Sequence, residues 1–395
     1  MNSTAQLDPF TESKRLQSLP PYIFAQLDQL KAQARERGVD LIDLGMGNPD
    51  KPTPQPVVDT VLRAIQDPAN HRYPTFDGKR ELRAEIARWY HARYGVTLDP
   101  DTQVLPLIGS KEGLAHLALA YVNPGDVTLA QSPGYPVHTR GTILAGGRVE
   151  PLPLTAERDY QIDFDAIDPE VARQARLLFF NYPHNPTAAV ADRALFERAL
   201  RFAQETRTLL VHDMAYAELA FDGYKPTSLL EIPGALEWGV EFHTFSKTFS
   251  MAGWRVGFVV GNARMIQALL KVKTNMDYGL FPAVQDAAIA ALNLPQHYVD
   301  ETVEMYRQRR DVVVDGLNAI GFDVRRPKAT MYVWVPVPKG FTAGAFASRL
   351  IDEAGVVVTP GTAFGTFGEG HVRISLIVPN QRLEEAVARI GKMSW

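Results

Sequence analysis

The sequence predicts an α/β fold built on a largely parallel sheet, with a smaller α+β unit after it. From about residue 60 to residue 290, short apolar segments alternate with longer helical patterns, which is typical of a parallel sheet covered by helices. After about residue 293 the alternation ends, and one long helical pattern is followed by short apolar segments. The length of 395 residues is enough for two domains.

The N-terminal segment is expected to be an arm that leads into a helix. Pro20 and Pro21 favour extended backbone just before a helical pattern begins. We therefore predict a first part over residues 1–55, which contains the arm and a portion of the small domain.

The large domain is expected over residues 56–293, and one of its helices over Ala194–Glu205. Its strands are expected at Val127–Ala130, Leu177–Asn181, Leu209–Asp213, Phe242–Phe245 and Gly257–Val260. Open α/β sheets bind ligands beyond the carboxyl ends of their strands, and several polar motifs lie at these ends. A shared site is therefore predicted there.

The C-terminal small domain is expected over residues 294–395. Its helices are predicted near Gln296–Ala319 and Ala343–Ala354. The segments MYVWVPV, VVVTPG and VRISLIV complete the α+β pattern.

The composition excludes several classes of protein. The formal net charge is −4 without a dense basic run, which disfavours nucleic-acid binding. The short run Arg307–Arg310 is expected on the solvated face of a helix. Because there are no cysteines, disulfides, thiolate metal sites and cysteine nucleophiles are excluded, and no metal site is expected. The N-terminus lacks a signal-peptide core and no apolar run approaches the ~20 residues that span a bilayer, so a cytoplasmic protein is expected.

The segment TFSKTFSMAGWR follows a predicted strand and carries the first candidate site residues. Partial burial and the positive charge of Arg255 would lower the pKa of Lys247. A lysine with a lowered pKa supplies the free amine that forms an imine with an aldehyde. Arg255 and the hydroxyls of Thr244 and Ser246 offer donors to a phosphate. Taken alone, such a motif more often marks a surface lysine in a loop.

Two further motifs follow strand ends. In VHDMAY, Asp213 could pair with a protonated ring nitrogen and Tyr216 could donate to a ring oxygen. A helix-capping aspartate is the alternative interpretation. In NYPHNPT, the amide of Asn185 could reach a phenolic oxygen, although this motif alone is typical of a plain turn.

Three more candidates come from other segments. Ser110 opens a helical pattern, where free N–H groups suit a phosphate, and it could also be a simple N-cap. Tyr135 in SPGYPVH could stack on a planar ring or pack in a Pro-Gly turn. Arg373 in HVRISL has apolar neighbours, so its partner is either a substrate carboxylate or a structural ion pair.

Taken in order, these motifs resemble the class I aminotransferases of pyridoxal-phosphate (PLP) fold type I. The order is GSK, PGYP, NPT, DxAY, SK with a downstream Arg, and a late Arg, from about Leu19 to the end. Segments such as LPPYIFAQL, GSKEGLAHL, AYAELAFDGYK and KATMYVW look closest to the alanine (glutamate–pyruvate) aminotransferases and their LL-diaminopimelate relatives. The resemblance implies a large PLP-binding domain with a mostly parallel seven-stranded sheet, and a smaller α+β domain.

The resemblance also implies a role for each motif residue. Lys247 would hold PLP as an imine, and Asp213 would pair with its pyridinium nitrogen. Asn185 and Tyr216 would bond its phenolic oxygen, while Tyr135 would stack on its ring. The phosphate would be surrounded by Ser110, the backbone of Lys111, Thr244, Ser246 and Arg255.

Substrate and partner contacts are implied in the same way. Arg373 would clamp the substrate α-carboxylate beside Asn185 and the Gly45 backbone, and Tyr22 in the arm would close over the substrate. Tyr73 resembles a tyrosine that reaches the phosphate of the neighbouring subunit, which implies a homodimer with shared sites.

Two departures from the family pattern are present. The chain has NPTA at Asn185–Ala188 where many relatives have NPTG, and this change concerns a turn rather than the chemistry. Thr244 stands where a serine is common, and it keeps the hydroxyl.

The implied activity moves an amino group between an amino acid and a 2-oxo acid, with Lys247 as general base. Another PLP activity on the same fold, such as a carbon–sulfur lyase or a decarboxylase, keeps the same lysine and aspartate. A regulator that senses an amino acid has little support, and a nicotinamide dehydrogenase lacks its GxGxxG motif.

The resemblance also implies an order of preference among amino donors. Alanine with 2-oxoglutarate is expected first, LL-diaminopimelate second and aspartate third. Preference is expected to depend on residues of either subunit, namely Tyr22, Asn275, Asp277 and Tyr278.

Overall fold

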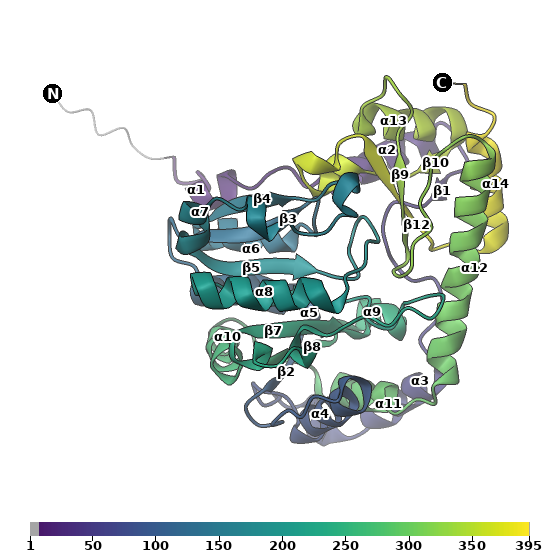
Figure 1. The fold of residues 1–395 in the computed structure, drawn as a ribbon. Coiled ribbons are helices and arrows are strands. Elements are labelled where there is room, and N and C mark those ends of the chain that lie inside the picture. Colours follow the sequence, from purple (N-terminus) through teal and green to yellow (C-terminus); the bar gives the residue numbers. More distant parts are fainter. Residues whose placement is uncertain (1–7, 395) are drawn as a thin grey trace.

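The computed structural model describes residues 8–394 of the chain. A large sheet with helices on both faces forms one part, and a smaller set of strands and helices lies beside it (Figure 1). Within the described range, no helix is both long enough and apolar enough to cross a membrane.

The large sheet has seven strands in the order β2-β8-β7-β6-β5-β3-β4. Only β8 runs antiparallel to its neighbours, so the predicted largely parallel sheet is confirmed. The strands are β2 (Val104–Leu107), β3 (Val127–Ser132), β4 (Arg148–Pro153), β5 (Ala175–Asn181), β6 (Leu209–Asp213), β7 (Gly239–Thr244) and β8 (Gly257–Gly261). All five predicted strands are present, but β7 ends at Thr244, and Phe245 already begins a short helix.

Alternation along the strands explains why the sheet has two covered faces. In β5, Leu177 and Phe179 join one apolar cluster, whereas Leu178 and Phe180 join another. Successive side chains of a strand point to opposite faces, and a sheet buried on both faces has continuous apolar strands.

Helices cover both faces of this sheet. The first cluster contains residues of α5 (Ser110–Tyr121), α6 (Val137–Ala145) and α10 (Ala263–Met276). The second contains residues of α4 (Arg80–Tyr94), α8 (Arg193–Thr206) and α11 (Pro282–Leu292). Smaller helices are α1 (Lys14–Gln17), α3 (Gln55–Ala64), α7 (Pro169–Gln174) and α9 (Phe245–Thr248). The predicted helix Ala194–Glu205 is confirmed as part of α8.

The smaller part is built around a three-stranded antiparallel sheet, β11-β12-β9, and a parallel pair, β1-β10. Its strands are β1 (Ile42–Asp43), β9 (Tyr332–Pro336), β10 (Val356–Val357), β11 (Thr359–Pro360) and β12 (His371–Ser375). Its helices are α2 (Ile23–Glu36), α12 (His297–Ala319), α13 (Ala343–Arg349) with a π-helical continuation to Ala354, and α14 (Asn380–Ile390).

The N-terminal segment packs with the C-terminal unit. Ile42 and Leu44 lie in the same apolar cluster as the β9 and β12 side chains, and β1 pairs with β10. The long helix α12 runs along one side of the molecule from the large part to the small one (Figure 1). The boundaries at residues 55 and 293 stay a prediction.

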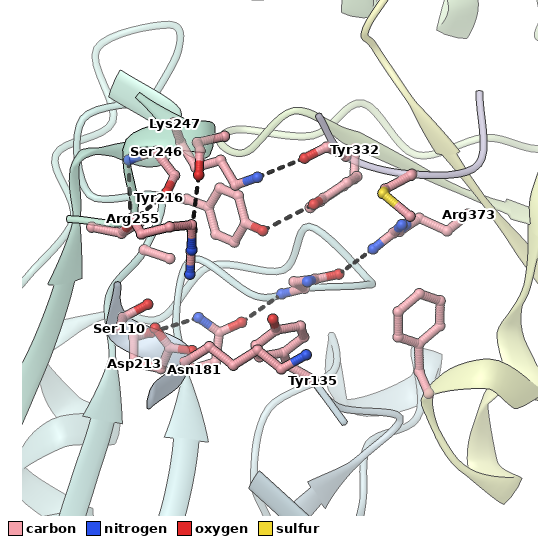
Figure 2. Close-up of a pocket in the computed structure, with 18 of the residues that line it drawn as sticks. Ser110, Tyr135, Asn181, Asp213, Tyr216, Ser246, Lys247, Arg255, Tyr332 and Arg373 are labelled. Atoms are coloured by element: carbon pink, nitrogen blue, oxygen red, sulfur yellow. Dashed lines mark hydrogen bonds between the residues drawn. The ribbon is translucent and has the colours of Figure 1, made fainter. Parts of the chain in front are cut away.

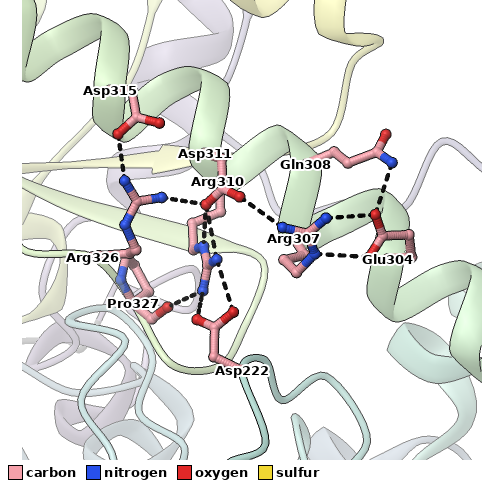
Figure 3. Close-up of polar contacts among 9 residues, drawn as sticks. All are labelled: Asp222, Glu304, Arg307, Gln308, Arg310, Asp311, Asp315, Arg326 and Pro327. Carbon is pink, nitrogen blue, oxygen red and sulfur yellow. Dashed lines mark hydrogen bonds and ion pairs between the residues drawn. The ribbon is translucent and has the colours of Figure 1, made fainter.

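The prediction for the run Arg307–Arg310 was wrong for two of its arginines. Arg309 and Arg310 are 5% and 2% exposed. Arg309 donates to both carboxylate oxygens of Asp50 at 2.6 and 2.8 Å. Arg310 donates to Asp222 and to a backbone carbonyl, as Figure 3 shows. Both carboxylates come from distant segments, so a helical face that looks solvated in sequence becomes an interface between the parts of the chain.

Candidate active site

A cavity of about 230 Å³ lies at the carboxyl edge of the large sheet and is bordered by the small part. β7 and β8 are antiparallel neighbours, so the segment between them turns back at this edge and brings α9 and Arg255 to the cavity. The predicted residues that line the cavity are Tyr22, Ser110, Lys111, Tyr135, Asn185, Asp213, Tyr216, Thr244, Ser246, Lys247, Arg255 and Arg373. The prediction that these motifs share one site is therefore consistent with the geometry.

Lys247 projects from α9 into the cavity, where its Nζ donates to the carbonyl oxygen of Gly47 at 2.6 Å (Figure 2). Burial of the amine lowers the pKa of Lys247, and the positive charges of Arg373 and Arg255 lower it further. The opposing effect of Tyr332 is smaller than that of burial. The lowered pKa favours a neutral amine, which is the form that attacks a carbonyl carbon or accepts a proton.

Asp213 ends β6 and is 3% exposed. Its Oδ2 lies 3.1 Å from Nε2 of His138, whereas Oδ1 has no hydrogen-bond partner among residues 8–394. Buried polar atoms in proteins are almost always satisfied, so an unpartnered carboxylate oxygen beside a cavity is suited to a donor from a ligand. The first helical element after Asp213 begins only at Leu229, so the capping interpretation does not apply.

Arg373 lies in β12 and is 3% exposed. Its Nη1 donates to Oδ1 of Asn185 at 2.8 Å, and its Nη2 donates to the carbonyl oxygen of Gly45 at 2.8 Å. The guanidinium lies over the rings of Tyr332 and Phe364, with centroids at 4.2 and 4.6 Å. None of these partners is a carboxylate, so a structural ion pair is not what holds Arg373. The arrangement is suited to a ligand carboxylate.

Hydroxyl, guanidinium and helix N–H groups converge at another wall of the cavity. Oγ1 of Thr244 lies 2.9 Å from Oγ of Ser246. Arg255 passes so close to Gly109 that a Cβ there would lie 2.3 Å from its Nη2. Ser110 is the first residue of α5 rather than its N-cap, and the N-cap Gly109 makes no side-chain bond. The N–H groups at this helix end therefore remain available, which suits a phosphate.

Tyr216 and Tyr332 place two hydroxyls 3.0 Å apart beside Lys247 (Figure 2). Burial and the neighbouring Tyr332 raise the pKa of Tyr216 well above its ordinary value. Burial would also raise the pKa of Tyr332, but the charges of Arg373 and Lys247 and the hydrogen bond with Tyr216 lower it. Burial raises the pKa of Tyr135, which lines the same cavity as a neutral phenol.

Sequence reasoning missed several residues that shape the site. Asn181 donates to the Asp213 carbonyl oxygen at 2.5 Å and accepts from the Asn185 backbone at 2.7 Å. His138 bonds Asp213, and Tyr332 bonds Tyr216. Asn181 and His138 lie inside motifs that were already singled out, so their proximity to those motifs was a usable signal. Tyr332 reads as an ordinary residue of an apolar strand.

Gly45 does not line this cavity, although its carbonyl oxygen accepts from Arg373. Two further groups of predicted residues also lie outside it. Tyr73 is 81% exposed and its ring packs at a tilt against Tyr278, with centroids 4.6 Å apart. Asp277 pairs with the buried amine of Lys273 at 3.0 Å, and Asn275 donates to a backbone carbonyl of its own helix. Within one chain, only Tyr22 of the residues expected to set preference lies at the cavity. The roles of the others through a second subunit stay predictions.

The residues present fit PLP on three separate observations. The amine of Lys247 is suited to the aldehyde, the unpartnered oxygen of Asp213 to the ring nitrogen, and the group at the α5 N-terminus to the phosphate. Each requirement is met at a different wall of one cavity. The arrangement can therefore hold an aldehyde cofactor covalently and keep its ring protonated.

Comparison with known proteins agrees with this geometry. Residues 39–390 match the family described as aminotransferase class I and II. A protein from Desulforudis audaxviator named LL-diaminopimelate aminotransferase is 52% identical over 96% of this chain and 97% of its own length. One of the same name from Moorella thermoacetica is 48% identical over 97% and 98%. The substrate-bound BacF structure from Bacillus subtilis has a TM-score of 0.94 and 40% identity, and covers 97% of both chains.

The chain therefore belongs to the class I and II aminotransferase family. It is an aminotransferase of PLP fold type I, and pyridoxal phosphate is its cofactor. The two relatives carry the name of the substrate expected second from the sequence, so the preference for alanine is less well supported than that for LL-diaminopimelate.

Proposed function

We propose that this aminotransferase takes the amino group of LL-diaminopimelate and transfers it to a 2-oxo acid such as 2-oxoglutarate. The observation that carries the proposal is the identity of 52% and 48% to relatives named for that substrate, over nearly the whole of each chain. Alanine and aspartate are the competing donors.

The surroundings of the arm support a donor with a second carboxylate. Lys111 and Arg140 both lie over the Tyr22 ring, at 5.7 and 4.7 Å from its centroid. Lys111 and Tyr22 line the cavity, and Arg140 donates to the carbonyl oxygen of Pro21 in the arm at 3.2 Å. LL-Diaminopimelate carries a distal carboxylate that these cations would attract, whereas alanine has none.

Lys247 is assigned as the residue that binds the cofactor and moves the proton. When bound, pyridoxal phosphate supplies an aldehyde that takes up amines and a ring that accepts an electron pair. Nζ of Lys247 takes the proton from the α-carbon of the amino donor, and it returns a proton to the α-carbon in the reverse half-reaction. Its lowered pKa keeps the amine able to accept that proton.

Asp213 is assigned to hold a proton at the ring nitrogen. Its Oδ1 is free for this contact, while His138 and Asn181 fix the carboxylate and the backbone behind it. Tyr216 and Asn185 are assigned to the phenolic oxygen of the ring, and Tyr135 to its face.

Arg373 is assigned to the α-carboxylate of the donor. Its guanidinium is already oriented by Asn185 and by Gly45, so few degrees of freedom remain to be fixed when the carboxylate binds. The phosphate is assigned to Ser110, the Lys111 backbone, Thr244, Ser246 and Arg255. Tyr22 is assigned to cover the donor, since it lies where the arm meets the cavity.

A homodimer with shared sites is part of the proposal. Tyr73, Phe76 and Tyr278 form an exposed aromatic cluster outside the cavity, with ring centroids of 4.6 and 5.1 Å between neighbours. Exposed aromatic groups of this kind are enriched at protein interfaces. Tyr73 is assigned to the phosphate in the site of the neighbouring subunit.

A panel of amino donors with 2-oxoglutarate tests the substrate. We expect kcat/KM for LL-diaminopimelate to exceed those for alanine and aspartate by about tenfold or more, which is a discrimination that polar contacts readily provide. The matched variant Lys111→Met keeps the backbone and should raise KM for LL-diaminopimelate several-fold without changing KM for alanine. A higher kcat/KM for alanine would refute the choice of substrate, and ammonia release without amino transfer would point to a lyase.

A further inference from the structure

We infer that Tyr332 is a positioning residue that joins the carboxylate side of the site to its lysine side, with its ring orienting Arg373 and its hydroxyl orienting Tyr216. The inference rests on the proposed roles of these two residues. Tyr332 lies in β9, is 3% exposed and lines the cavity.

The ring of Tyr332 supports the guanidinium from one side. The Arg373 guanidinium carbon lies 4.2 Å from the ring centroid, and its Nη groups donate to Asn185 and Gly45. Stacking on an aromatic face restricts a planar guanidinium without using its donors. The donors can therefore reorganise toward a carboxylate while the ring holds the plane of the group.

The hydroxyl of Tyr332 acts at the other end of the same side chain. It lies 3.0 Å from the Tyr216 hydroxyl. A dashed line joins the two hydroxyls in Figure 2. Tyr216 has one proton, so when Tyr216 donates to the cofactor oxygen, the hydrogen bond between the two tyrosines must be donated by Tyr332. A donor that itself accepts a hydrogen bond is polarised and bonds more strongly. Tyr332 thereby sets the direction and the strength of the Tyr216 contact.

The local backbone holds Tyr332 in a strained segment. Thr330 has a φ of +76° and no exposed surface. A β-branched residue at this φ is an outlier that persists only where its surroundings impose it. Oγ1 of Thr330 accepts from the Tyr332 backbone N–H at 3.2 Å, and its own N–H donates to the Leu219 carbonyl oxygen at 2.8 Å. Such strain is concentrated at functional sites, and here it lies two residues before Tyr332.

The opposite side of Tyr332 is closed by Gly47. A Cβ on Gly47 would lie 2.1 Å from the Tyr332 hydroxyl oxygen. The Gly47 carbonyl oxygen is also the acceptor for Lys247. Tyr332 therefore touches the segment that orients the lysine amine, as well as Tyr216 and Arg373.

The charged and titratable groups that interact with the Tyr332 hydroxyl come from several elements. They are Lys247 from α9, Arg373 from β12, Tyr216 from the segment after β6, Tyr135 from the segment before α6 and Tyr306 from α12. Burial raises the pKa of Tyr332, but the charge of Arg373 opposes that effect and lowers it. A more acidic phenol is the stronger hydrogen-bond donor to Tyr216. Removing the hydroxyl alone should consequently change the titration of the cofactor–lysine chromophore.

Two variants separate the hydroxyl from the ring. Tyr332→Phe keeps the stacking on Arg373 and removes the hydroxyl. We expect the absorbance pKa of the bound cofactor to rise by about half a unit, and KM for the best amino donor to stay within about twofold. Tyr332→Leu also removes the ring, and we expect KM for that donor to rise about tenfold, because Arg373 loses its support.

Tyr224→Phe is the matched control. The Tyr224 hydroxyl donates to the Ala191 carbonyl oxygen at 2.8 Å outside the cavity, so its removal should leave the absorbance titration and KM unchanged. Circular dichroism verifies folding, and Tyr332→Met replaces Tyr332→Leu should the latter not fold.

An absorbance pKa unchanged in Tyr332→Phe, or a KM unchanged in the variant that lacks the ring, overturns the inference. The measurements use whichever donor the native enzyme turns over best. A wrong choice of substrate would therefore appear in the donor panel and leave this experiment interpretable.

Discussion

Two buried carboxylates on neighbouring strands of the same sheet have opposite hydrogen-bond states. Glu241 in β7 accepts at one oxygen from Tyr90 at 2.6 Å and His243 at 2.8 Å, and at the other from His212 and the Leu229 backbone, both at 2.8 Å. Asp213 in β6 has only His138 near one oxygen and no partner at the other within the described chain.

The difference separates a carboxylate whose oxygens are all bonded within the fold from one that has an oxygen without a protein partner in the part of the chain that the structure describes. Both are almost fully buried, so burial by itself does not identify a functional group. Four donors around Glu241 offset the desolvation of its charge, whereas the free oxygen of Asp213 stays uncompensated until a donor arrives. The number of hydrogen-bonded carboxylate oxygens therefore distinguishes the two residues. It predicts that substitution of Glu241 lowers stability and that substitution of Asp213 lowers kcat.

The largest effect is expected on the ligand side, at Lys247. Lys247→Ala removes the amine that binds the cofactor and moves the α-proton, and we expect kcat to fall by about 10⁴-fold, at the upper end for loss of an acid–base group. Steady-state rates with the best donor measure this change. Near-normal turnover would contradict the assigned mechanism, and borohydride labelling of another lysine would relocate it.

Asp213→Asn tests the carboxylate that awaits a donor. We expect kcat to fall by about 10²- to 10³-fold, as on loss of one preorganised electrostatic contact. The free energy of unfolding without cofactor should change by less than about 1 kcal/mol, because one oxygen has no partner to lose. Urea unfolding of the cofactor-free protein measures this free energy. A large destabilisation would show that Asp213 has a structural role instead.

Glu241→Gln is the matched variant on the structural side. It places an amide against donors, so the free energy of unfolding should fall by about 3 kcal/mol, as when a buried charged network loses one member. The kcat of the folded fraction should stay within about threefold, because Glu241 does not line the cavity. A loss of kcat with an unchanged free energy of unfolding would mean that Glu241 acts in catalysis, which would contradict the structural role predicted for it.

The contrast also predicts a difference in acid stability. Burial alone would raise the pKa of Glu241, but hydrogen bonds from His212 and His243 hold it well below its ordinary range. In the unfolded chain this group protonates near pH 4.3, so its contribution is present above about pH 4.3 and is lost as the pH falls toward the folded value. Relative to Glu241→Gln, the native protein should lose up to about 1.4 kcal/mol more per pH unit in that window.

The smallest effect is expected at a strained turn beside the site. Ala188 in the NPTA motif has a φ of +58° and is 5% exposed. Ala188→Gly relieves the left-handed strain but increases the freedom of the unfolded chain, so we expect a net stabilisation of about 0.5 kcal/mol. Thermal unfolding measures it, and unchanged kcat would show that the turn acts on stability alone.

Much of the fold and of the site could be predicted from local patterns. The strands that precede the motifs could be located from continuous apolar segments. A strand buried on both faces of a sheet is apolar at successive positions, so its sequence differs clearly from that of a half-exposed strand. Asp213, Asn185 and Lys247 each follow such a strand or lie within four residues of one. Motif order then identified the family, and residues that line the same cavity were predicted together.

The contacts that local patterns could not provide join distant segments. Arg309 meets Asp50 across 259 positions, and Tyr332 meets Tyr216 across 116. A pairing of this kind depends on how the two parts of the chain pack, so neither residue carries a signal in its own neighbourhood. This is why Arg309 was predicted to be solvated and Tyr332 was passed over.

The sequence by itself determined the α/β architecture, the family and most of the motif residues that line the cavity, because periodicity and ordered motifs are local properties of the chain. Only the tertiary structure decided which buried carboxylate is satisfied and which is free. That distinction depends on donors supplied by other elements: Tyr90, His212, His243 and the Leu229 backbone for Glu241, but only His138 for Asp213. Hydrogen-bond satisfaction is a property of the assembled core, and no single segment encodes it.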